Sequence, residues 1–417
     1  MQTFDHTTAH HGSHWREILA EARATCPIVH SPQHGGYYVL TRYADVMAAL
    51  RDHKHFSSER SWDDQGNNLM QGVAIPPQPI RVGFLEMDPP QSLTYRRLMN
   101  RWFTRGAIER GRGRIAQAAT WAVDRVIDRG ECDIIDDLAS PFQCMVILDL
   151  LGVPLDRGAT YKAIADRLTA QEPDALTDIE WMRADLKREF LQQKAAGGGA
   201  GLIADLATAQ VDGAPLDDDM AAELLLMLLL GGEGTTIATI ANLLLHLARN
   251  PGDKARLTAD LTLLPAAVDE MMRYYAPSPG LSRTVTDEVT VGGHTFQAGD
   301  RVLLSFASAN YDENVFTDPD RVDITREHNP HLSFGAGAHR CIGSLLAKAN
   351  AETFLAEILT RVPEFTIDME KVRPYEHAAL SNGFFSVPMR YTPGPAPAGV
   401  GDVPAFTAPR VAPEGLA

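Results

Sequence analysis

The most informative stretch of this chain reads Phe334-Gly335-Ala336-Gly337-Ala338-His339-Arg340-Cys341-Ile342-Gly343. It places one cysteine in a glycine-rich loop, immediately before an apolar segment of helical character at 342–355. A thiolate there would lie at a helix N-terminus, where unpaired N–H groups and the helix dipole stabilise negative charge. The glycines let the backbone fold tightly around the sulfur. The whole stretch therefore predicts a thiolate metal ligand, although an isolated Cys-x-Gly would more often be a buried thiol.

The composition is that of a large globular protein. The 417 residues are 45% hydrophobic and 22% charged, which is enough apolar material for a sizeable core. The four cysteines are widely spaced and form no Cys-x-x-Cys pair: Cys26, Cys132, Cys144 and Cys341. This spacing argues against a zinc site or a disulfide framework and favours a reducing cytoplasm.

Charge and hydropathy restrict the location and the partners. Residues 1–14 are polar and His-rich, which predicts neither a signal peptide nor a membrane anchor. The most apolar region, 220–248, is interrupted by polar residues that include Glu223 and Glu233, so we expect a buried core helix and no membrane span. The net charge of −16 disfavours nucleic acid as a partner.

Periodicity predicts a helix-rich chain with small sheets toward its C-terminus. Helical patterns occur at 14–24, 43–52, 93–128, 141–151, 160–169, 178–194, 202–210 and from 217 through the apolar region. Strand patterns occur at 35–41, 281–286, 289–291, 301–304 and 384–391. Residues 60–90 predict a long irregular loop, and the tail 393–417, with six prolines, predicts disorder.

The loop around Cys341 resembles the haem-binding loop of cytochromes P450, in which an aromatic residue, two glycines, a basic residue, the cysteine and a final glycine recur at this spacing. The resemblance extends from Pro27 to about Tyr391. It implies a mainly α fold with small β-sheets, one domain over 14–392 after a flexible N-terminus (1–13), and haem between the central long helix and the cysteine loop. Cys341 would be the axial ligand of haem b (iron protoporphyrin IX), a thiolate that favours O–O cleavage, with Phe334 and Gly335 beside the cofactor.

The same resemblance implies three basic residues at the haem propionates. Met87-Asp88-Pro89-Pro90 followed by Arg96 resembles the start of a helix that supplies one propionate arginine, although Ser92 stands where many relatives have histidine. Ser282-Arg283-Thr284 resembles the strand that carries the second arginine, and His339 is the third expected partner. Arginine suits this role because its planar fork binds carboxylates bidentately.

A further match concerns a structural network on the cysteine side. Glu270-Met271-Met272-Arg273 is an i,i+3 pair on one helix face. In the family, the equivalent glutamate and arginine form a buried network with an arginine from the segment before the haem loop. Asp318-Pro319-Asp320-Arg321 resembles that segment, so Arg321 is the expected third member.

The central helix contains Leu230-Gly231-Gly232-Glu233-Gly234-Thr235-Thr236. The family pattern here is a small residue, glycine, any residue, an acid and threonine. The small residues, among them Gly232, let haem and dioxygen approach the helix. The threonine and the acid relay protons to the bound oxygen. Thr235 matches, but Gly234 occupies the acid position and Glu233 stands one residue early, a rotation of about 100°. Four interpretations remain open. Glu233 relays protons through a locally distorted helix, water replaces the missing acid, the enzyme does chemistry that needs a different proton supply, or Glu233 is a buried structural acid.

By their positions in the family pattern, six apolar residues would line the substrate pocket. They are Val73, Ile75, Met227, Leu230, Leu281 and Phe384, with Phe385 as an alternative to the last. They suit a lipophilic substrate such as a terpenoid, a fatty acid or a steroid-like skeleton. Core packing would explain any one of them equally well.

The resemblance implies a haem-thiolate monooxygenase that uses O2. Electrons are expected from a ferredoxin, its reductase and NAD(P)H, because the chain has no flavin or nicotinamide fingerprint and no iron–sulfur cysteine set. Seven arginines against one acid between Arg96 and Arg114 suggest a docking surface for that acidic partner. We expect a cytoplasmic monomer. The alternatives are peroxide-driven or nitric oxide reductase-like chemistry on the same fold, or a haem-binding sensor.

Overall fold

The computed structural model describes residues 4–78, 80–169, 172, 174–376 and 381–407. The chain packs into two compact units where we expected one domain over 14–392. The first unit comprises Met1–Leu93, Pro265–Ile342 and Pro374–Gly383, and the second comprises Thr94–Leu264, Gly343–Arg373 and Phe384–Ala417. Neither unit is continuous in sequence, because the chain alternates between a sheet and a helix bundle, and composition therefore shows no boundary.

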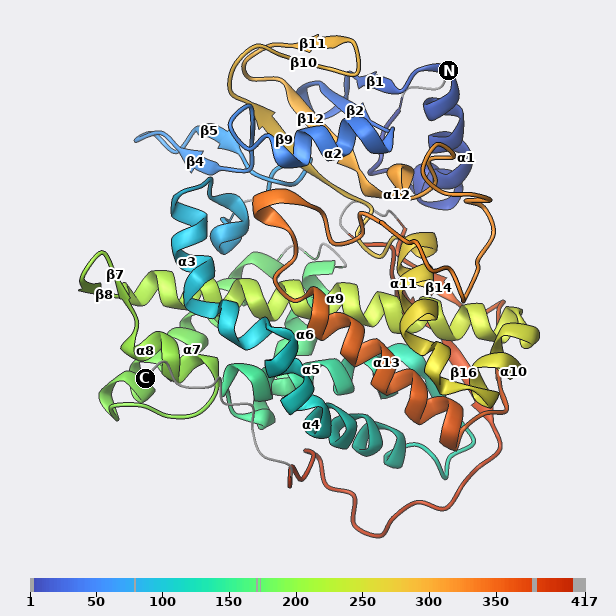
Figure 1. Cartoon of the computed structure of the whole chain (residues 1–417). Helices are drawn as coiled ribbons and strands as arrows, with labels where there is room; N and C mark the ends of the chain where they lie inside the picture. The colour runs from blue at the N-terminus through green and yellow to red at the C-terminus, as the bar shows by residue number, and fades with distance from the viewer. Residues whose placement is uncertain (1–3, 79, 170–171, 173, 377–380, 408–417) are drawn as a thin grey trace. The chain divides into compact units, whose positions relative to one another are not determined.

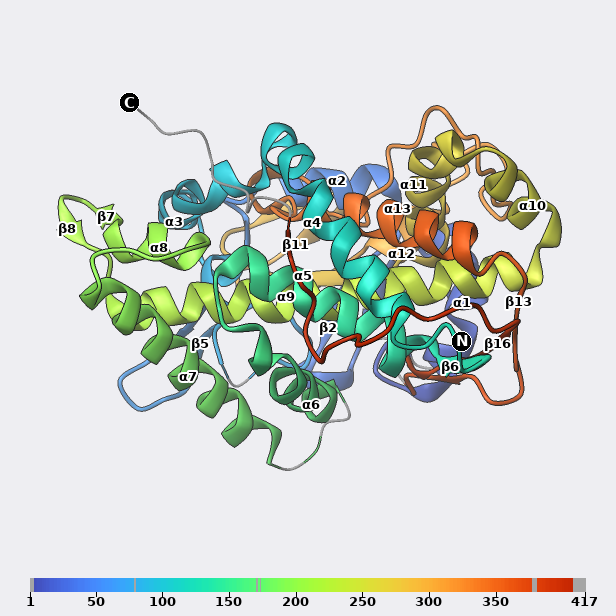
Figure 2. The ribbon, with the colours of Figure 1, turned by 90° about the horizontal axis from the view of Figure 1, so that it is seen from below.

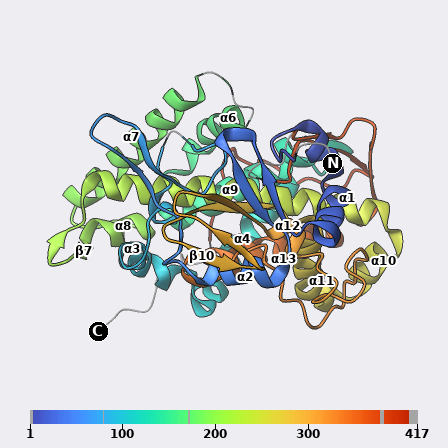
Figure 3. The same ribbon diagram turned by 90° about the horizontal axis from the view of Figure 1, so that it is seen from above.

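The first unit is built on a five-stranded sheet with the order β1-β2-β12-β9-β3. These strands are β1 (Ile28–Ser31), β2 (Tyr37–Leu40), β12 (Arg301–Ser305), β9 (Gly280–Val285) and β3 (Phe56–Ser57). β12 pairs parallel with β2 and antiparallel with β9. One face packs with α2 (Tyr43–Arg51) in a cluster that includes Val302, and the other packs with α1 (Ala9–Thr25) in a cluster that includes Leu303 (Figures 1 and 3). Alternation along each strand produces these two separate cores.

The predicted loop at 60–90 is partly wrong, because it contains regular elements. β4 (Arg60–Trp62) and β5 (Asn68–Gln71) form a hairpin, and η2 (Gly83–Glu86) is a short helix. The Asp63 carboxylate accepts the backbone N–H groups of Gln65 at 2.9 Å and Asn67 at 2.8 Å. The polar residues that suggested irregular structure thus build a tight turn between two short strands.

The rest of the first unit consists of short elements between the sheet and the cysteine loop. They are η1 (Gln33–Gly35), β10 (Val289–Val291), β11 (His294–Phe296), α12 (Phe306–Ala309) and η7 (Gly337–His339), together with α11 (Leu264–Tyr275), whose first residue belongs to the second unit. The predicted strands 281–286, 289–291 and 301–304 correspond to β9, β10 and β12.

The second unit is a helix bundle around α9 (Asp218–Arg249), which packs against α5, α7 and α13 (Figure 2). Asp217 caps α9, because its carboxylate accepts the N–H groups of Asp219 at 3.0 Å and Met220 at 2.9 Å. By length and composition α9 could cross a membrane, but 72% of its most apolar 18-residue window is buried inside the protein. α9 is therefore the central core helix that the sequence predicted.

The other elements of this unit surround α9. The helices are α3 (Gln91–Met99, which begins in the first unit), η3 (Asn100–Phe103), α4 (Arg105–Asp124), η4 (Ile134–Ala139), α5 (Ser140–Leu151), η5 (Leu155–Arg157), α6 (Gly158–Thr169), α7 (Ala175–Ala195), α8 (Leu202–Thr208), α10 (Pro251–Ala259), η6 (Leu261–Leu263) and α13 (Ser344–Arg361). The strands are β6 (Glu131–Asp133), β7 (Gln210–Val211), β8 (Ala214–Pro215), β13 (Phe365–Ile367), β14 (Arg373–Pro374), β15 (Phe384–Ser386) and β16 (Pro388–Tyr391).

The N-terminal segment differs from the flexible stretch predicted for residues 1–13. α1 begins at Ala9, Phe4 is buried, and the His6 ring lies 2.8 Å from the Tyr37 hydroxyl. Residues 1–3 lie outside the described part of the chain. An aromatic residue and a histidine therefore anchor a segment whose overall polarity suggested disorder.

The tail also departs from the prediction of disorder as far as residue 407. The Trp121 indole donates to the carbonyl of Gly401 at 2.9 Å, and the Arg114 guanidinium lies 4.1 Å from the centre of the Phe406 ring. These contacts place the segment along α4 (Figure 2). Residues 408–417 lie outside the described residues. A few specific anchors outweigh a composition that is poor in apolar residues.

Candidate functional site

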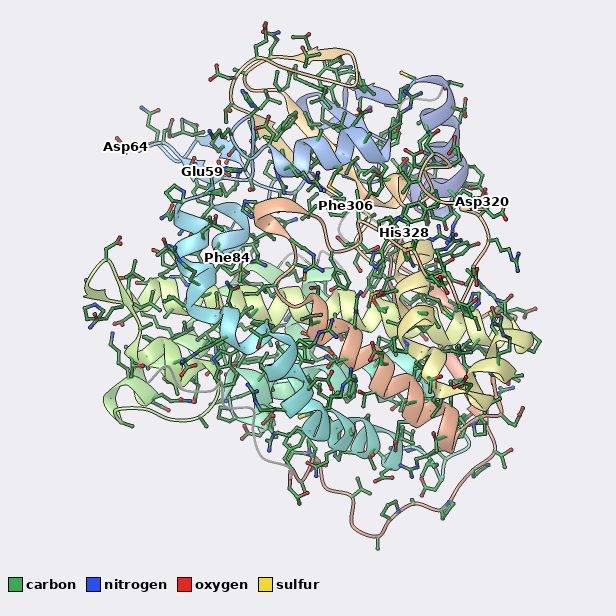
Figure 4. The ribbon with its side chains drawn as sticks, viewed as in Figure 1. Glu59, Asp64, Phe84, Phe306, Asp320 and His328 are labelled. Atoms are coloured by element: carbon green, nitrogen blue, oxygen red, sulfur yellow. The ribbon has the colours of Figure 1, made fainter. Side chains whose placement is uncertain are left out.

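The cysteine loop of the first unit is a tight turn that requires its glycines. The Cys341 N–H donates to the carbonyl of Phe334 at 2.9 Å. Gly335 and Gly337 have positive φ angles of 62° and 67°, which side chains of L-residues rarely allow. A Cβ on Gly337 would lie 2.3 Å from the carbonyl oxygen of Leu50, and one on Gly335 would lie 3.8 Å from the Phe306 ring, which Figure 4 labels. The loop can therefore form only with glycine at 337.

Cys341 differs from the other three cysteines in its surroundings. It is exposed and lies three residues before α13 begins. Burial raises the pKa of the Cys132 thiol to about 12 and that of Cys144 well above its usual value. Cys26 is exposed, and its sulfur donates to the carbonyl of Ile28. Burial thus keeps two of these cysteines as thiols, and Cys341 combines accessibility with the glycine loop.

The chemistry of the cysteine loop indicates the kind of metal site. No group of three or more His, Cys, Asp or Glu side chains that could hold a metal ion occurs among the residues that the structure describes. A single thiolate therefore suits a metal whose remaining ligands come from a prosthetic group.

A buried arginine in the same unit lacks a matching carboxylate. Arg283 on β9 is 2% exposed, and its Nη1 donates to the carbonyl of Ser282 at 2.7 Å. Burial lowers the pKa of Arg283 to about 10, and the charge of Asp88 opposes that shift. Across the described ranges, no carboxylate lies within ion-pair distance of Arg283. A buried guanidinium in this state is suited to the carboxylate of a bound cofactor.

His339 is oriented by residues of the first unit. Its Nε2 lies 2.8 Å from the Ser58 hydroxyl, and the Ser58 N–H donates to Asp88 at 3.0 Å. The first unit thus contains Cys341, Arg283 and His339, three of the expected cofactor residues. Arg96 lies on α3 in the second unit and is half-buried.

The network around Glu270 corrects one prediction. Arg273 donates to both Glu270 oxygens, at 2.8 and 2.9 Å, and both side chains are fully buried. The third member is Arg326, whose guanidinium Nε donates to Glu270 at 2.9 Å. Arg321 was the wrong choice, because its residue is exposed and its carbonyl oxygen accepts from Arg273 at 3.2 Å. Asp318, with a φ of +48°, turns the chain before this contact.

The glycine-rich turn of α9 presents one open face. α9 runs as a continuous α-helix through this turn, so it contains no bulge at Gly234. Among the residues that the structure describes, no atom beyond the neighbouring helix backbone lies within 4 Å of a Cβ built on Gly231 or Gly234. The Thr235 hydroxyl donates to the carbonyl of Gly231 at 3.3 Å. Helical spacing therefore groups Leu230, Gly231, Gly234 and Thr235 on the open face.

Gly232 and Glu233 lie on other sides of the helix. A Cβ on Gly232 would be 3.3 Å from the Ile147 side chain of α5, so Gly232 faces α5 and the prediction that it admits the cofactor is wrong. Glu233 is 3% exposed, and one of its oxygens has no hydrogen-bond partner among the described residues. Burial, reinforced by Asp166 and opposed by Lys162, raises the pKa of Glu233 to about 7. Glu233 is thus buried and does not lie on the open face with Thr235, and the charged groups that act on it, Asp166 and Lys162, belong to α6.

The expected pocket residues do not form one group. Ile75 belongs to the core cluster of Leu303, whereas Leu281 packs against the cluster of Leu304, which lies on the opposite sheet face. Ile75 is therefore a core residue, and its placement beside Leu281 in a pocket was wrong. Val73, also in the first unit, is buried. In the second unit, Met227 is buried and Leu230 is half-buried on α9, and Phe384 is half-buried on β15.

Arg301 organises the segment around Val73, a role that no motif in the sequence indicated. Its guanidinium donates to the carbonyls of Gly72 at 2.8 Å and Ala74 at 2.9 Å. The Glu86 carboxylate accepts the Val73 N–H at 2.9 Å. The sequence did carry one signal for Arg301, a single arginine at the start of an apolar strand. A charged side chain that is buried there must have polar partners.

The arginine-rich stretch from Arg96 to Arg114 is partly neutralised. Arg101 pairs with Asp205, and Arg114 pairs with Asp149. Arg112 lies 2.8 Å from Glu109 and 3.0 Å from Glu352. Arg97 and Arg105 are exposed, and Arg97 donates to the Thr94 hydroxyl at 3.2 Å. The local positive charge is therefore smaller than the sequence suggested.

A family model, related sequences and a solved structure all match this chain and agree on one family. The family model described as Cytochrome P450 matches residues 183–380. The chain is 33% identical over 369 residues to Steroid C26-monooxygenase of Mycobacterium tuberculosis, covering 86% of this chain and 96% of that protein. It is 36% identical over 324 residues to Cyclomarin C epoxidase CymV of Salinispora arenicola, covering 75% and 80%. The structure of CYP109E1 from Bacillus megaterium in complex with testosterone matches with a TM-score of 0.79 and 26% identity, covering 90% of this chain and 98% of that one.

Proposed function

We propose that this chain, which belongs to the cytochrome P450 family and is a haem-containing monooxygenase acting on lipophilic substrates, takes a steroid or steroid-like molecule as its substrate. We also propose that Cys341 is the axial ligand of the haem. The similarity to Steroid C26-monooxygenase over nearly the full length of both chains carries the substrate proposal. Apolar side chains such as Met227, Leu230 and Leu281 suit such a skeleton.

The residues of the first unit fit a haem. Haem held by a cysteine thiolate supplies dioxygen activation and O–O cleavage. The loop at 334–343 would hold the Cys341 sulfur as a ligand, and the buried Arg283 would bind one propionate carboxylate. His339, oriented by Ser58, would donate a hydrogen bond to a propionate. Arg96 is the proposed partner of the second propionate.

Proton delivery is assigned to Thr235. A hydroxyl can both donate and accept hydrogen bonds, and that of Thr235 lies on the open face that Gly231 and Gly234 leave clear. Water on that face would take the place of the acid that is absent at Gly234. Glu233 is buried and does not lie on that face, so we assign it no direct role at the reacting oxygen.

The family requires redox partners, and we assign that role to a ferredoxin and its reductase, with NAD(P)H as the electron source. Arg97 and Arg105 are exposed and would attract an acidic partner. Arg101 is a weaker candidate, because Asp205 already neutralises it. The proposal includes a monomeric enzyme in the cytoplasm.

The substrate proposal is tested by titrating the ferric protein and following the haem Soret band. We expect steroids that carry a full side chain to shift the haem to the high-spin form at lower concentrations than testosterone, terpenoids or fatty acids. Products would then be identified by mass spectrometry after turnover with ferredoxin and reductase. A high-spin shift with fatty acids or terpenoids and none with any steroid would contradict the substrate class.

The position of Glu233 favours a second candidate, peroxide-driven oxidation on the same fold. With Gly234 at the acid position and Glu233 buried, the chain has no carboxyl group beside Thr235 on the open face in its described part. Faster turnover with hydrogen peroxide than with reduced ferredoxin, measured on the same substrate, would support this candidate.

A further inference from the structure

We propose that Gln143 and Asn350 are positioning residues that hold the glycine-rich turn of α9 in the orientation Thr235 needs. Gln143 on α5 is 1% exposed, and its Nε2 donates to the carbonyl of Gly232 at 2.8 Å. Asn350 on α13 is fully buried, and its Nδ2 donates to Gln143 Oε1 at 2.8 Å. The proposal rests on the role assigned above to Thr235. All three helices belong to the second unit.

The turn needs an external support because its sequence weakens the helix. Gly231, Gly232 and Gly234 each stabilise a helix less than alanine would, because glycine loses more backbone freedom. A helical carbonyl oxygen has a second lone pair, so Gly232 can accept from Gln143 in addition to its place in the helix. The bond from α5 therefore stabilises the part of α9 that its own residues stabilise least.

The amide pair determines which end of the Gln143 side chain faces Gly232. Asn350 donates to the oxygen end of the Gln143 amide, which directs the nitrogen end toward Gly232. Both side chains are buried, and a buried amide without partners would be destabilising. Asn350 therefore sets the orientation of Gln143, and Gln143 sets the position of the Gly232 carbonyl.

This contact decides which residues of α9 face outward. With Gly232 held against Ile147 of α5, the residues on either side are rotated by about 100° each. That rotation places Glu233 on the buried side of α9 and leaves Thr235 on the open face with Gly231 and Gly234. If the contact were lost, the glycine turn could rotate or unwind, and the Thr235 hydroxyl would no longer hold a single position.

The support also reaches the helix that follows the cysteine. α13 begins at Ser344, three residues after Cys341, and Asn350 lies within its second turn. The chain of hydrogen bonds from Asn350 through Gln143 to Gly232 therefore joins the helix next to the thiolate loop with the helix that carries Thr235. One buried amide pair links the two elements that the proposed chemistry uses.

The test compares Gln143→Met with the matched control Gln193→Met. Gln193 makes the same type of bond, from its Nε2 to the carbonyl of Gly152 at 3.1 Å, in the same unit and without contact to the glycine turn. Hydrogen–deuterium exchange of the ferric holoenzyme would be followed in peptides that cover 230–238. We expect Gln143→Met to speed exchange there about tenfold, which corresponds to a loss of about 1.4 kcal/mol in local stability, and Gln193→Met to leave it unchanged.

A second readout concerns the fate of the electrons. With testosterone as the probe and ferredoxin and reductase as donors, we expect Gln143→Met to raise the fraction of NADPH electrons released as hydrogen peroxide at least threefold, with little change in KM. If Gln143 only stabilised the fold, Gln143→Met would lower the haem content, or kcat and KM together, without changing the fraction of electrons released as peroxide. Equal exchange rates and equal peroxide fractions in Gln143→Met and wild type would overturn the proposal.

Two further variants distinguish a failure of this proposal from a failure of the role assigned to Thr235. Asn350→Leu removes the partner that orients the Gln143 amide and leaves the amide in place. Exchange at 230–238 and the peroxide fraction should therefore rise, but less than in Gln143→Met. If Gln143→Met does not fold, Asn350→Leu tests the proposal in its place. Thr235→Ala tests the function on which the proposal rests. If Thr235→Ala leaves the peroxide fraction at the wild-type value, the role of Thr235 is wrong, whereas the exchange experiment still decides whether Gln143 holds the turn.

Discussion

Glu233 is a carboxyl group whose protonation is linked to the stability of the folded chain. Burial raises its pKa from 4.5 to about 7, with Asp166 adding to the shift and Lys162 opposing it. The unfolded chain therefore loses the proton first as pH rises. The stabilisation that the neutral carboxyl contributes is complete below pH 4.5 and is lost as pH rises through about 7. The shift corresponds to about 3 kcal/mol.

The first prediction is that Glu233→Gln removes this pH dependence. The amide does not ionise, so between pH 5 and pH 8 the variant should gain about 3 kcal/mol in free energy of unfolding relative to wild type. Urea unfolding at both pH values measures the difference. Glu180→Gln, at an exposed glutamate, is the control and should follow wild type. Parallel pH curves for Glu233→Gln and wild type would show that the carboxyl titrates normally.

Also at the residue scale, Arg326 and Arg321 contact the buried Glu270–Arg273 pair in different ways. Arg326 donates to Glu270 through its guanidinium, whereas Arg321 contributes a carbonyl oxygen. We expect Arg326→Met to lower the free energy of unfolding by about 3 kcal/mol, because Glu270 would keep a buried charge with one partner fewer. Arg321→Met should change it by less than about 0.5 kcal/mol. Thermal unfolding and the carbon monoxide difference spectrum report both effects, and the reverse order of sensitivity would restore Arg321 to the network.

At the scale of elements, the segment at 393–407 behaves as a strap along α4. Phe406 lines a small pocket of about 40 Å³ together with Trp102, Ile108 and Leu346, and the guanidinium of Arg114 lies over its ring. The Thr407 N–H donates to the Gln117 side chain at 3.1 Å. These contacts join the tail to α4 and to the start of α13, so the tail contributes to the packing of the second unit.

The prediction for this element is a loss of stability on removal of one ring. Phe406→Ala should lower the free energy of unfolding by about 2 kcal/mol, from lost apolar burial and a lost cation–π contact. Val403→Ala is the matched control, because Val403 is exposed, and it should have little effect. Urea unfolding of the holoenzyme measures both. If the two variants were equally stable, the strap would not be anchored through Phe406.

α9 shows how an element can be predicted while its orientation is not. Its apolar length and its acidic start identified a buried central helix, and the structure confirms that helix over Asp218–Arg249. The contacts with α5 and α6 decide which of its residues are buried. A helix of this composition is apolar on every side, so its sequence carries no stripe from which an open face could be predicted.

At the scale of the whole molecule, the fold class and the family were accessible from the sequence. The helical and strand patterns correspond to most of the observed elements, and the matches to known cytochromes P450 confirm the fold and the haem monooxygenase class. The short strands β6 and β13 were missed, because three residues carry little pattern of their own and neither strand is followed by a glycine pair such as Gly292-Gly293, which marked β10. Each compact unit is assembled from separate parts of the chain, so no linker or change of composition in the sequence marks where one ends.

The sequence by itself determined the cysteine loop, because the chemistry of that loop is local: its glycines, its aromatic residue and its cysteine act within ten consecutive residues. Only the tertiary structure decided that Gly232 faces α5, that Glu233 is buried, that Ile75 is a core residue and that Arg326 completes the network. Each of these depends on a rotation of one residue or on the approach of a distant segment. Packing between elements sets such rotations, and no local pattern encodes them.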